Sequence, residues 1–401
     1  MEKTWRWFGP SDVISLKALR QIGVEGIVTA LHHIPNGEIW TREEIRKRRE
    51  YIEAQGLRWS VVESLPVTEE IKLASPLRDR HLENYLLSLE NLGLEGIHTV
   101  CYNFMPVIDW IRTDLYKPNP DGTKSLYFDY ARFACFDLYI LKREGAGNDY
   151  PEEIREQAKQ LYKTMPGDEK RALVENIIVK TQGFVSGNIT DKDKQPVTLF
   201  KKLLARYQGV DKTRLRDNFR QFMSAVAPVA ERLDVRLCIH PDDPPFPVLG
   251  LPRIVTGKED VEWLLSAVDS PVNGLTFCAG SLSSGLHNDV PELARRFAAR
   301  THFVHLRSTE VRENRNFGET DHLSGRGHLA EVIRIFLKEQ ERRKKEGWKN
   351  WRLPMRPDHG SLMLSDIENN QYNPGYSFYG RMKALAELSG MMAAIHYLDQ
   401  K

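Results

Sequence analysis

The sequence predicts one α/β domain, residues 1–401, that folds as an eight-stranded parallel (β/α)8 TIM barrel with a helical insertion after its fourth strand. Short apolar runs alternate with amphipathic charged segments along most of the chain. This rhythm is typical of parallel strands joined by right-handed crossovers. About eight such runs occur, the number of strands that closes a barrel. No Gly-rich phosphate-binding turn follows the early strands, so the competing doubly wound open sheet is disfavoured.

The first four strands are predicted ahead of the insertion. Each is a short apolar or β-branched run, at residues 4–8, 26–32, 58–64 and 96–103. Helices are expected between them, from about Val13, after Thr41 and over residues 79–93. Thr41 is a good N-cap residue, and Gly56 can end the helix that Thr41 begins.

The strand–helix rhythm stops between residues 108 and 198, where the sequence is charged and tyrosine-rich. Helices are predicted at 152–165 and 168–181. The segment is too long for a barrel loop and too structured for a linker. We therefore expect a helical insertion that acts as a cap or a subunit contact rather than in catalysis.

The rhythm resumes in the second half of the chain. A helix is predicted from near Val197 to Leu233, and later helices from about Lys258, over 291–300, from Leu329 and from Arg381. The remaining four strands are predicted at residues 235–241, 274–281, 302–308 and 353–359.

Composition excludes several classes of protein. A net charge of +2 gives no electrostatic case for binding nucleic acid or an anionic membrane. No apolar run is long enough to span a bilayer. The N-terminal MEKTWRWFGPSD lacks the apolar core of a signal peptide, so a cytoplasmic location is expected. Four cysteines in so long a chain do not make a disulfide framework.

Four of the predicted strands stop on residues that can bind a metal. His240, Cys278, His305 and the pair Asp358-His359 each lie at or near a strand's C-terminal end. In a β/α barrel these ends meet at one mouth. Two imidazoles, a thiolate and a carboxylate could therefore surround one divalent ion. Mixed N, O and S donors suit Mn²⁺, Fe²⁺ or Zn²⁺ better than Mg²⁺ or Ca²⁺.

The alternative for each donor is an ordinary core residue, because buried cysteines usually act as small hydrophobes and histidines can be held by hydrogen bonds. The position of a residue within its strand distinguishes a candidate metal ligand from a core residue. Cys238 precedes His240 by two residues, so it shares the same side but lies deeper and is assigned to the core. His302 begins its strand and points away from the side of His305. Cys101 and Cys135 are also expected to be structural.

Other polar residues near the strand ends are candidates for contacting a substrate. Arg307 shares the side of His305 and could bind a carboxylate, or it could form a surface salt bridge. His33 and Asn103 follow the second and fourth strands and either line the mouth or pack in loops. Asp358 and His359 are adjacent, so one can coordinate a metal while the other acts as acid or base.

Several long motifs carry a family resemblance. They are GIVTALHHIPNGEIW (26–40), CYNFMPVIDWIRT (101–113), CIHPDDPP (238–245), FCAGS (277–281), HLRS (305–308), RPDHG (356–360) and NPGYSFYGRMKALAEL (373–388). Together they resemble the mannonate dehydratases of hexuronate breakdown. The likeness extends from the N-terminal TWRWFGP to the last predicted helix.

The resemblance implies a barrel of the xylose-isomerase-like type and the conversion of D-mannonate to 2-keto-3-deoxy-D-gluconate and water. It also implies a divalent metal, Mn²⁺ or Fe²⁺. The family's metal ligands correspond to His240, Cys278, His305 and Asp358. Its acid/base residues correspond to His359 and Tyr376, although Tyr372 and Tyr379 lie close to the latter.

The expected partner is therefore a small sugar acid, bound by Arg307, His33 and Asn103, in a protein that forms a homo-oligomer (a dimer or higher). Two alternatives remain. A metal-dependent sugar isomerase would normally use a carboxylate-rich site, often with paired metals, and the cysteine speaks against it. A metal-stabilised carbohydrate-binding protein would need no acid or base beside its metal, whereas Asp358-His359 and the nearby tyrosines supply them.

Overall fold

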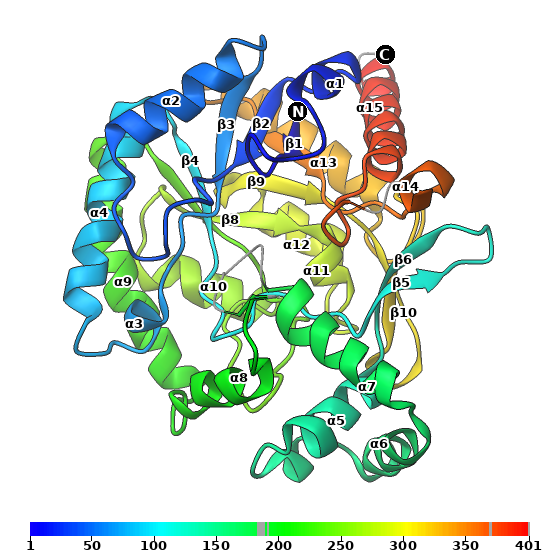
Figure 1. The fold of residues 1–401 in the computed structure, drawn as a ribbon. Coiled ribbons are helices and arrows are strands. Elements are labelled where there is room, and N and C mark those ends of the chain that lie inside the picture. The colour runs from blue at the N-terminus through cyan, green and yellow to red at the C-terminus, as the bar shows by residue number, and fades with distance from the viewer. Residues whose placement is uncertain (183–188, 191, 369–370, 400–401) are drawn as a thin grey trace.

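The computed structural model describes the chain except for residues 183–188, 191, 369–370 and 400–401. Eight parallel strands close into a barrel in the order β1-β2-β3-β4-β7-β8-β9-β12, and β12 pairs again with β1 (Figure 1). The barrel prediction is confirmed. The eight strands are β1 (Glu2–Arg6), β2 (Gly26–Thr29), β3 (Arg58–Glu63), β4 (Thr99–Tyr102), β7 (Arg236–Ile239), β8 (Asn273–Cys278), β9 (Thr301–Leu306) and β12 (Pro354–Pro357).

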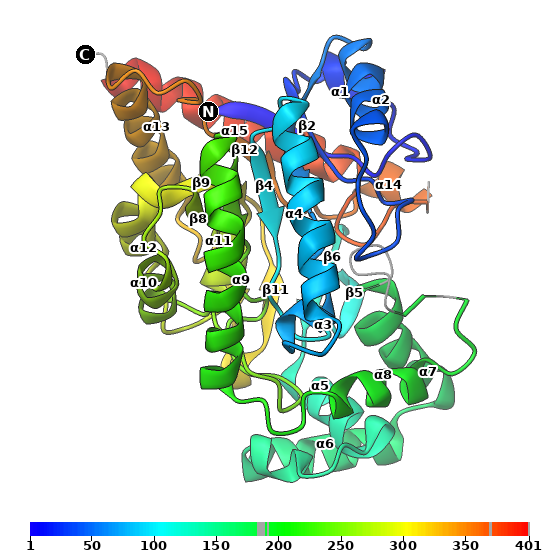
Figure 2. The same ribbon diagram turned by 90° about the vertical axis from the view of Figure 1, so that its left-hand side faces the viewer.

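Helices surround the barrel (Figures 1 and 2). They are α1 (Leu16–Gln21), α2 (Arg42–Glu53), α3 (Glu69–Lys72), α4 (Arg78–Leu94), α9 (Lys212–Arg232), α10 (Lys258–Ala267), α11 (Ala279–Ser283), α12 (Val290–Phe297), α13 (Leu329–Lys345), α14 (Leu364–Glu368) and α15 (Tyr379–Asp399). Thr41 caps α2 as predicted, because its hydroxyl accepts a hydrogen bond from the N–H of Glu44. Within the described part of the chain, each helix is too short or too polar to cross a membrane.

The insertion is not purely helical, which corrects the prediction. It contains a hairpin of β5 (Asp114–Pro118) and β6 (Lys124–Phe128). This hairpin joins β10 (Thr309–Val311) and β11 (Phe317–Glu319) in a four-stranded antiparallel sheet, which neighbouring sequence could not indicate because its halves lie far apart in the chain.

The helices of the insertion gather at one end of the molecule, away from the N-terminus (Figure 2). They are α5 (Tyr130–Cys135), α6 (Glu152–Thr164), α7 (Gly167–Val174) and α8 (Pro196–Ala205), with π-helical turns at Phe136–Leu141 and Glu175–Lys180. The helix predicted from Val197 to Leu233 is in fact two, α8 and α9, separated by a turn with Gly209 at a φ of +78°. Helices α5 to α8 pack around a second apolar core that includes Cys135 and is separate from the main barrel core.

A layer of apolar side chains fills the barrel interior. It consists of Val28, Val61, Cys101, Cys238 and Phe303, all essentially buried. Cys101 and Cys238 are therefore structural, as predicted. Because alternate residues of a strand face the same side, the residues two positions further along project into the space above this layer, towards the C-terminal mouth.

Candidate metal centre and active-site cavity

The four predicted metal donors converge above the apolar layer. Nε2 of His240 lies 3.2 Å from Nδ1 of His305. The sulfur of Cys278 lies 3.4 Å from Oδ2 of Asp358, whose Oδ1 is 3.6 Å from Nδ1 of His305. The ligand atoms of His240, Cys278 and His305 all lie within 4.8 Å of one another. Strand register contributes to this, since Cys278 of β8 pairs directly with His305 of β9.

The chemistry of this cluster fits a divalent cation. Nδ1 of His240 lies 2.7 Å from the carbonyl oxygen of Pro241, so it donates there and leaves the Nε2 lone pair facing the other donors. Burial opposes a charge on this ring, but the adjacent Cys278 sulfur outweighs burial and raises the pKa of His240 to about 10. The cluster thus attracts positive charge. A thiolate, a carboxylate and two neutral imidazoles would balance the two charges of a metal ion.

A second group of charges surrounds the far side of the His305 ring. Oε1 of Glu63, at the end of β3, lies 3.7 Å from Nε2 of His305, and Nε of Arg356 lies 3.1 Å from the same nitrogen. Glu63 is itself paired with Arg6 at 3.0 Å and with Arg356 at 2.9 Å. Burial works against ionisation, but Arg356 and Arg6 hold the pKa of Glu63 far below its usual range. Nε2 of His305 accepts a hydrogen bond from Arg356, which orients the ring, and Glu63 in turn holds Arg356.

Arg307 lies on the His305 side of β9, as predicted, and is only 1% exposed. Its guanidinium pairs with Asp243 at 2.8 Å, with Asp358 at 3.0 Å and with Glu319. The surface salt bridge considered above is therefore wrong. Three carboxylates already engage this cation, so it balances their charge whatever it contributes to substrate binding.

His359 is held from several sides. Its Nδ1 lies 2.7 Å from Oε1 of Glu319. Burial opposes ionisation of Glu319, but His359 and Arg307 lower its pKa to about 2, so it is a carboxylate that can only accept. Nδ1 of His359 is therefore the donor, and Nε2 is left for proton exchange. Gly375, with a φ of +83°, packs against the ring, and a Cβ there would lie 2.9 Å from its Cγ.

The candidate acid/base residues line one cavity together with His240 and Asp358. Tyr376 packs edge-on against His359, with ring centroids 5.1 Å apart. Tyr376 is buried, whereas Tyr379 is 39% exposed at the start of α15 and Tyr372 packs on the barrel core. Of the three tyrosines, Tyr376 is therefore the one whose position suits an acid/base residue. Asn103 lines the same cavity.

His33 is not brought to this cavity. Its side chain is 52% exposed, and Nε2 lies 2.8 Å from Oε2 of Glu44 on α2. The turn after β2 directs the ring towards that helix, so this placement does not support a contact between His33 and substrate.

Sequence reasoning missed the charged residues that surround the donors. Arg112, in the insertion, pairs with Asp243 at 2.7 Å and with Glu319 at 3.3 Å, and is fully buried. Its neighbour Trp110 packs on His359 with ring centroids 5.2 Å apart. The start of the insertion therefore forms part of the site. Only Asp243 gave a signal in the sequence, since it follows His240 closely in the PDDPP segment.

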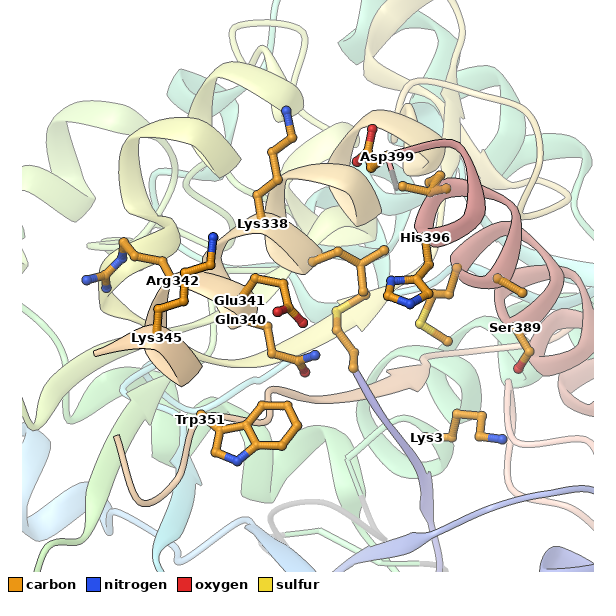
Figure 3. A pocket seen from close by; sticks show the side chains of 15 residues that line it. Lys3, Lys338, Gln340, Glu341, Arg342, Lys345, Trp351, Ser389, His396 and Asp399 are labelled. Atoms are coloured by element: carbon orange, nitrogen blue, oxygen red, sulfur yellow. The ribbon is translucent and has the colours of Figure 1, made fainter. Parts of the chain in front are cut away.

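A larger cavity of about 830 Å³ lies at the opposite end of the barrel (Figure 3). It is bounded by α13, α15 and the start of β1, and side chains such as Lys3, Lys338, Glu341 and Trp351 line it. The metal donors lie elsewhere, at the C-terminal ends of the strands. Barrel enzymes place their chemistry at those ends, so the smaller cavity is the candidate active site.

Comparison with known proteins agrees with this assignment. The profile of the D-mannonate dehydratase family matches residues 1–401. The chain is 47% identical over 392 residues to the mannonate dehydratase of Marinomonas sp., covering 98% of each protein. It is 47% identical over 400 residues to that of Chromohalobacter salexigens, covering 99% of this chain and all of the relative. The crystal structure of mannonate dehydratase from Streptococcus suis serotype 2 matches with 32% identity and a TM-score of 0.75, covering 100% and 96% of the two chains.

Proposed function

The chain belongs to the D-mannonate dehydratase family, and we propose that it carries out the family's reaction in the cavity above the barrel's apolar layer. The reaction is that of a hydro-lyase, in which D-mannonate loses water and becomes 2-keto-3-deoxy-D-gluconate. The observation that carries the proposal is the convergence of His240, Cys278, His305 and Asp358 beside His359 and Tyr376. A sugar isomerase is not favoured.

We propose that these four donors hold one Mn²⁺ or Fe²⁺ ion. A thiolate among nitrogen and oxygen donors supports a transition metal over Mg²⁺. When bound, the ion supplies Lewis acidity that stabilises negative charge on the substrate. Arg356 and the carbonyl oxygen of Pro241 orient the two histidines that would bind it.

The elimination breaks the C2–H and C3–O bonds of D-mannonate. One group removes the C2 proton, and a second donates a proton to the departing 3-hydroxyl, which leaves as water. The resulting enol takes up a proton at C3 and becomes the 2-keto acid. We assign the first two transfers to His359 and Tyr376. Because Glu319 holds Nδ1 of His359, Nε2 is the atom that exchanges the proton.

Arg307 and Asn103 are proposed to contact the substrate. Removal of the C2 proton builds negative charge next to the substrate carboxylate, and the buried cation Arg307 stabilises this charge from beside Asp358. Asn103 lines the cavity and contacts the bound sugar acid.

The proposed setting is a cytoplasmic homo-oligomer, a dimer or higher. All four cysteines are buried thiols, the usual state in a reducing compartment. The exposed Tyr397 and Leu398 at the end of α15 provide an apolar surface suited to a subunit contact. Sedimentation analysis would measure the assembly directly.

The test is incubation of the Mn²⁺- or Fe²⁺-loaded protein with D-mannonate under anaerobic, reducing conditions. We expect a 2-keto-3-deoxy acid to accumulate as D-mannonate disappears, followed by NMR. The absence of this product with either metal would refute the proposal, and a product that retains all its hydroxyl groups would favour the isomerase.

A further inference from the structure

A second polar cavity, of about 180 Å³, adjoins the active-site cavity and extends away from the metal centre. The two cavities share Ser64, Asn103 and Asp109, which therefore lie where they meet. Ser64 follows β3, Asn103 follows β4, and Asp109 belongs to the start of the insertion. If the reacting carbons of a substrate lie at the metal centre, the rest of its chain can extend into this second cavity.

Asp109 differs from the other carboxylates of the active-site cavity. Glu63, Asp243 and Asp358 are each paired with two arginines. Among the described residues, Asp109 forms no ion pair, and Asn103 lines the same two cavities. A carboxylate can accept about four hydrogen bonds, so Asp109 retains acceptor capacity although it is only 8% exposed. Burial raises the pKa of Asp109, whereas Arg112 and Arg307 hold that of Asp243 low against burial.

Charge is unevenly distributed along the joined cavities. The metal end carries Arg6, Arg307 and Arg356, which are paired with Glu63, Asp243 and Asp358, and a bound divalent ion would add positive charge there. At the other end, Lys72 is neutralised by Glu69, which lies 2.8 Å from it. With the ion bound, a substrate carboxylate would be attracted to the metal end and repelled by Asp109. Neutral hydroxyl groups, which donate hydrogen bonds, suit the Asp109 end.

We propose that Asp109 binds hydroxyl groups on C5 and C6 of the substrate and thereby selects a long-chain aldonate. The proposal rests on the proposed function and adds to it the orientation of the substrate, with C1 to C3 at the metal centre and the polyol tail towards Ser64, Asn103 and Asp109. Asp109 is a specificity-determining residue that takes no part in the proton transfers.

The test compares two substrates in the metal-loaded full-length enzyme. One is D-mannonate. The other is the four-carbon 2,3,4-trihydroxybutanoate, which has the same configuration at C2 and C3 but lacks C5 and C6 and their hydroxyl groups. Asp109→Ala and Asp109→Asn are compared with the wild type, and Asp217→Asn, on the exposed face of α9, is the matched control. Mn²⁺ binding is measured for every variant, since it reports a folded site independently of turnover.

For D-mannonate, Asp109→Ala should raise KM by about 10- to 100-fold with a smaller change in kcat, because the lost hydrogen bonds form in ground and transition states alike. Asp109→Asn keeps one acceptor oxygen, so its KM should lie between those of Asp109→Ala and the wild type. For the four-carbon acid, the variants and the wild type should not differ. The assignment would be overturned if KM rose equally for both substrates or for neither. Loss of Mn²⁺ binding in both variants would also overturn it. Wild-type enzyme that fails to dehydrate D-mannonate would instead refute the proposed function.

Discussion

Two charged side chains contact Nδ1 of His359, Glu319 at 2.7 Å and Arg307 at 3.1 Å, and the carboxylate fixes the proton there. Glu319 accepts from Nδ1 and so leaves Nε2 free for substrate. Glu319 is in turn held by Arg307 and Arg112, which belong to a barrel strand's end and to the insertion. The chemistry of one imidazole therefore depends on charged residues from three separate parts of the chain.

Glu319→Gln should lower kcat by about 100-fold or more with little change in KM, because the amide no longer fixes the tautomer and orientation of His359. Glu313→Gln, at an exposed position near the same strand, is the control and should behave as wild type. Steady-state kinetics with D-mannonate checks this. A Glu319→Gln variant that changed only KM would show that Glu319 positions substrate and not His359.

The convergence of the candidate metal donors was predictable from sequence, whereas their charged neighbours were not. Depth along the strand distinguished His240 from Cys238, alternation distinguished His305 from His302, and the packing of Cys238 in the apolar layer bears out the first of these. His302 instead bonds the carbonyl oxygen of Pro271. Glu319 sits on a three-residue strand of a sheet assembled from distant segments. Local periodicity carries no information about such a contact.

At the scale of elements, the insertion and the barrel are joined by one buried cluster of charges. Arg112 pairs with Asp243 after β7 and with Glu319 of β11, and its guanidinium packs over the ring of Phe317 at 4.8 Å. The barrel strands and most of the helices followed from apolar runs and caps such as Thr41. The hairpin of β5 and β6 did not, because its pairing with β11 depends on residues nearly two hundred positions away.

Arg112→Met should destabilise the protein by about 3 kcal/mol or more, because removing one partner leaves buried carboxylates under-compensated. Arg220→Met removes an exposed partner of Asp217 on α9 and should cost less than about 0.5 kcal/mol. Urea unfolding of both variants measures the difference. Equal stabilities would mean that the Arg112 cluster contributes nothing to the attachment of the insertion.

At the scale of the whole molecule, a band of buried carboxylates makes stability depend on pH. The pKa values of Glu63, Asp243, Asp358 and Glu319 all lie below their ordinary values, because arginines and histidines outweigh burial. Groups with a lowered folded pKa stabilise the fold above their unfolded pKa. That stabilisation is lost as pH falls through the folded pKa.

The free energy of unfolding should therefore fall as pH drops from about 4.5 towards 2. Lowering the pKa of Glu319 from 4.5 to about 2 corresponds to roughly 3 kcal/mol. The difference in stability between wild type and Glu319→Gln should accordingly be largest near neutral pH and shrink below about 4.5. Urea unfolding across this range measures it, and a difference independent of pH would contradict the assigned ionisation.

The central claim is that one divalent ion, held by the donors of four strands, supports dehydration of D-mannonate. The most direct measurement is the initial rate as Mn²⁺ is added in steps to chelator-treated protein, with Cys278→Ser in parallel and the buried Cys135→Ser of the insertion core as the control. The rate for wild type and Cys135→Ser should rise linearly and level off at one Mn²⁺ per chain, whereas Cys278→Ser should need at least about tenfold more free Mn²⁺. Full activity without metal, saturation at two ions per chain, or an unchanged titration for Cys278→Ser would contradict the account.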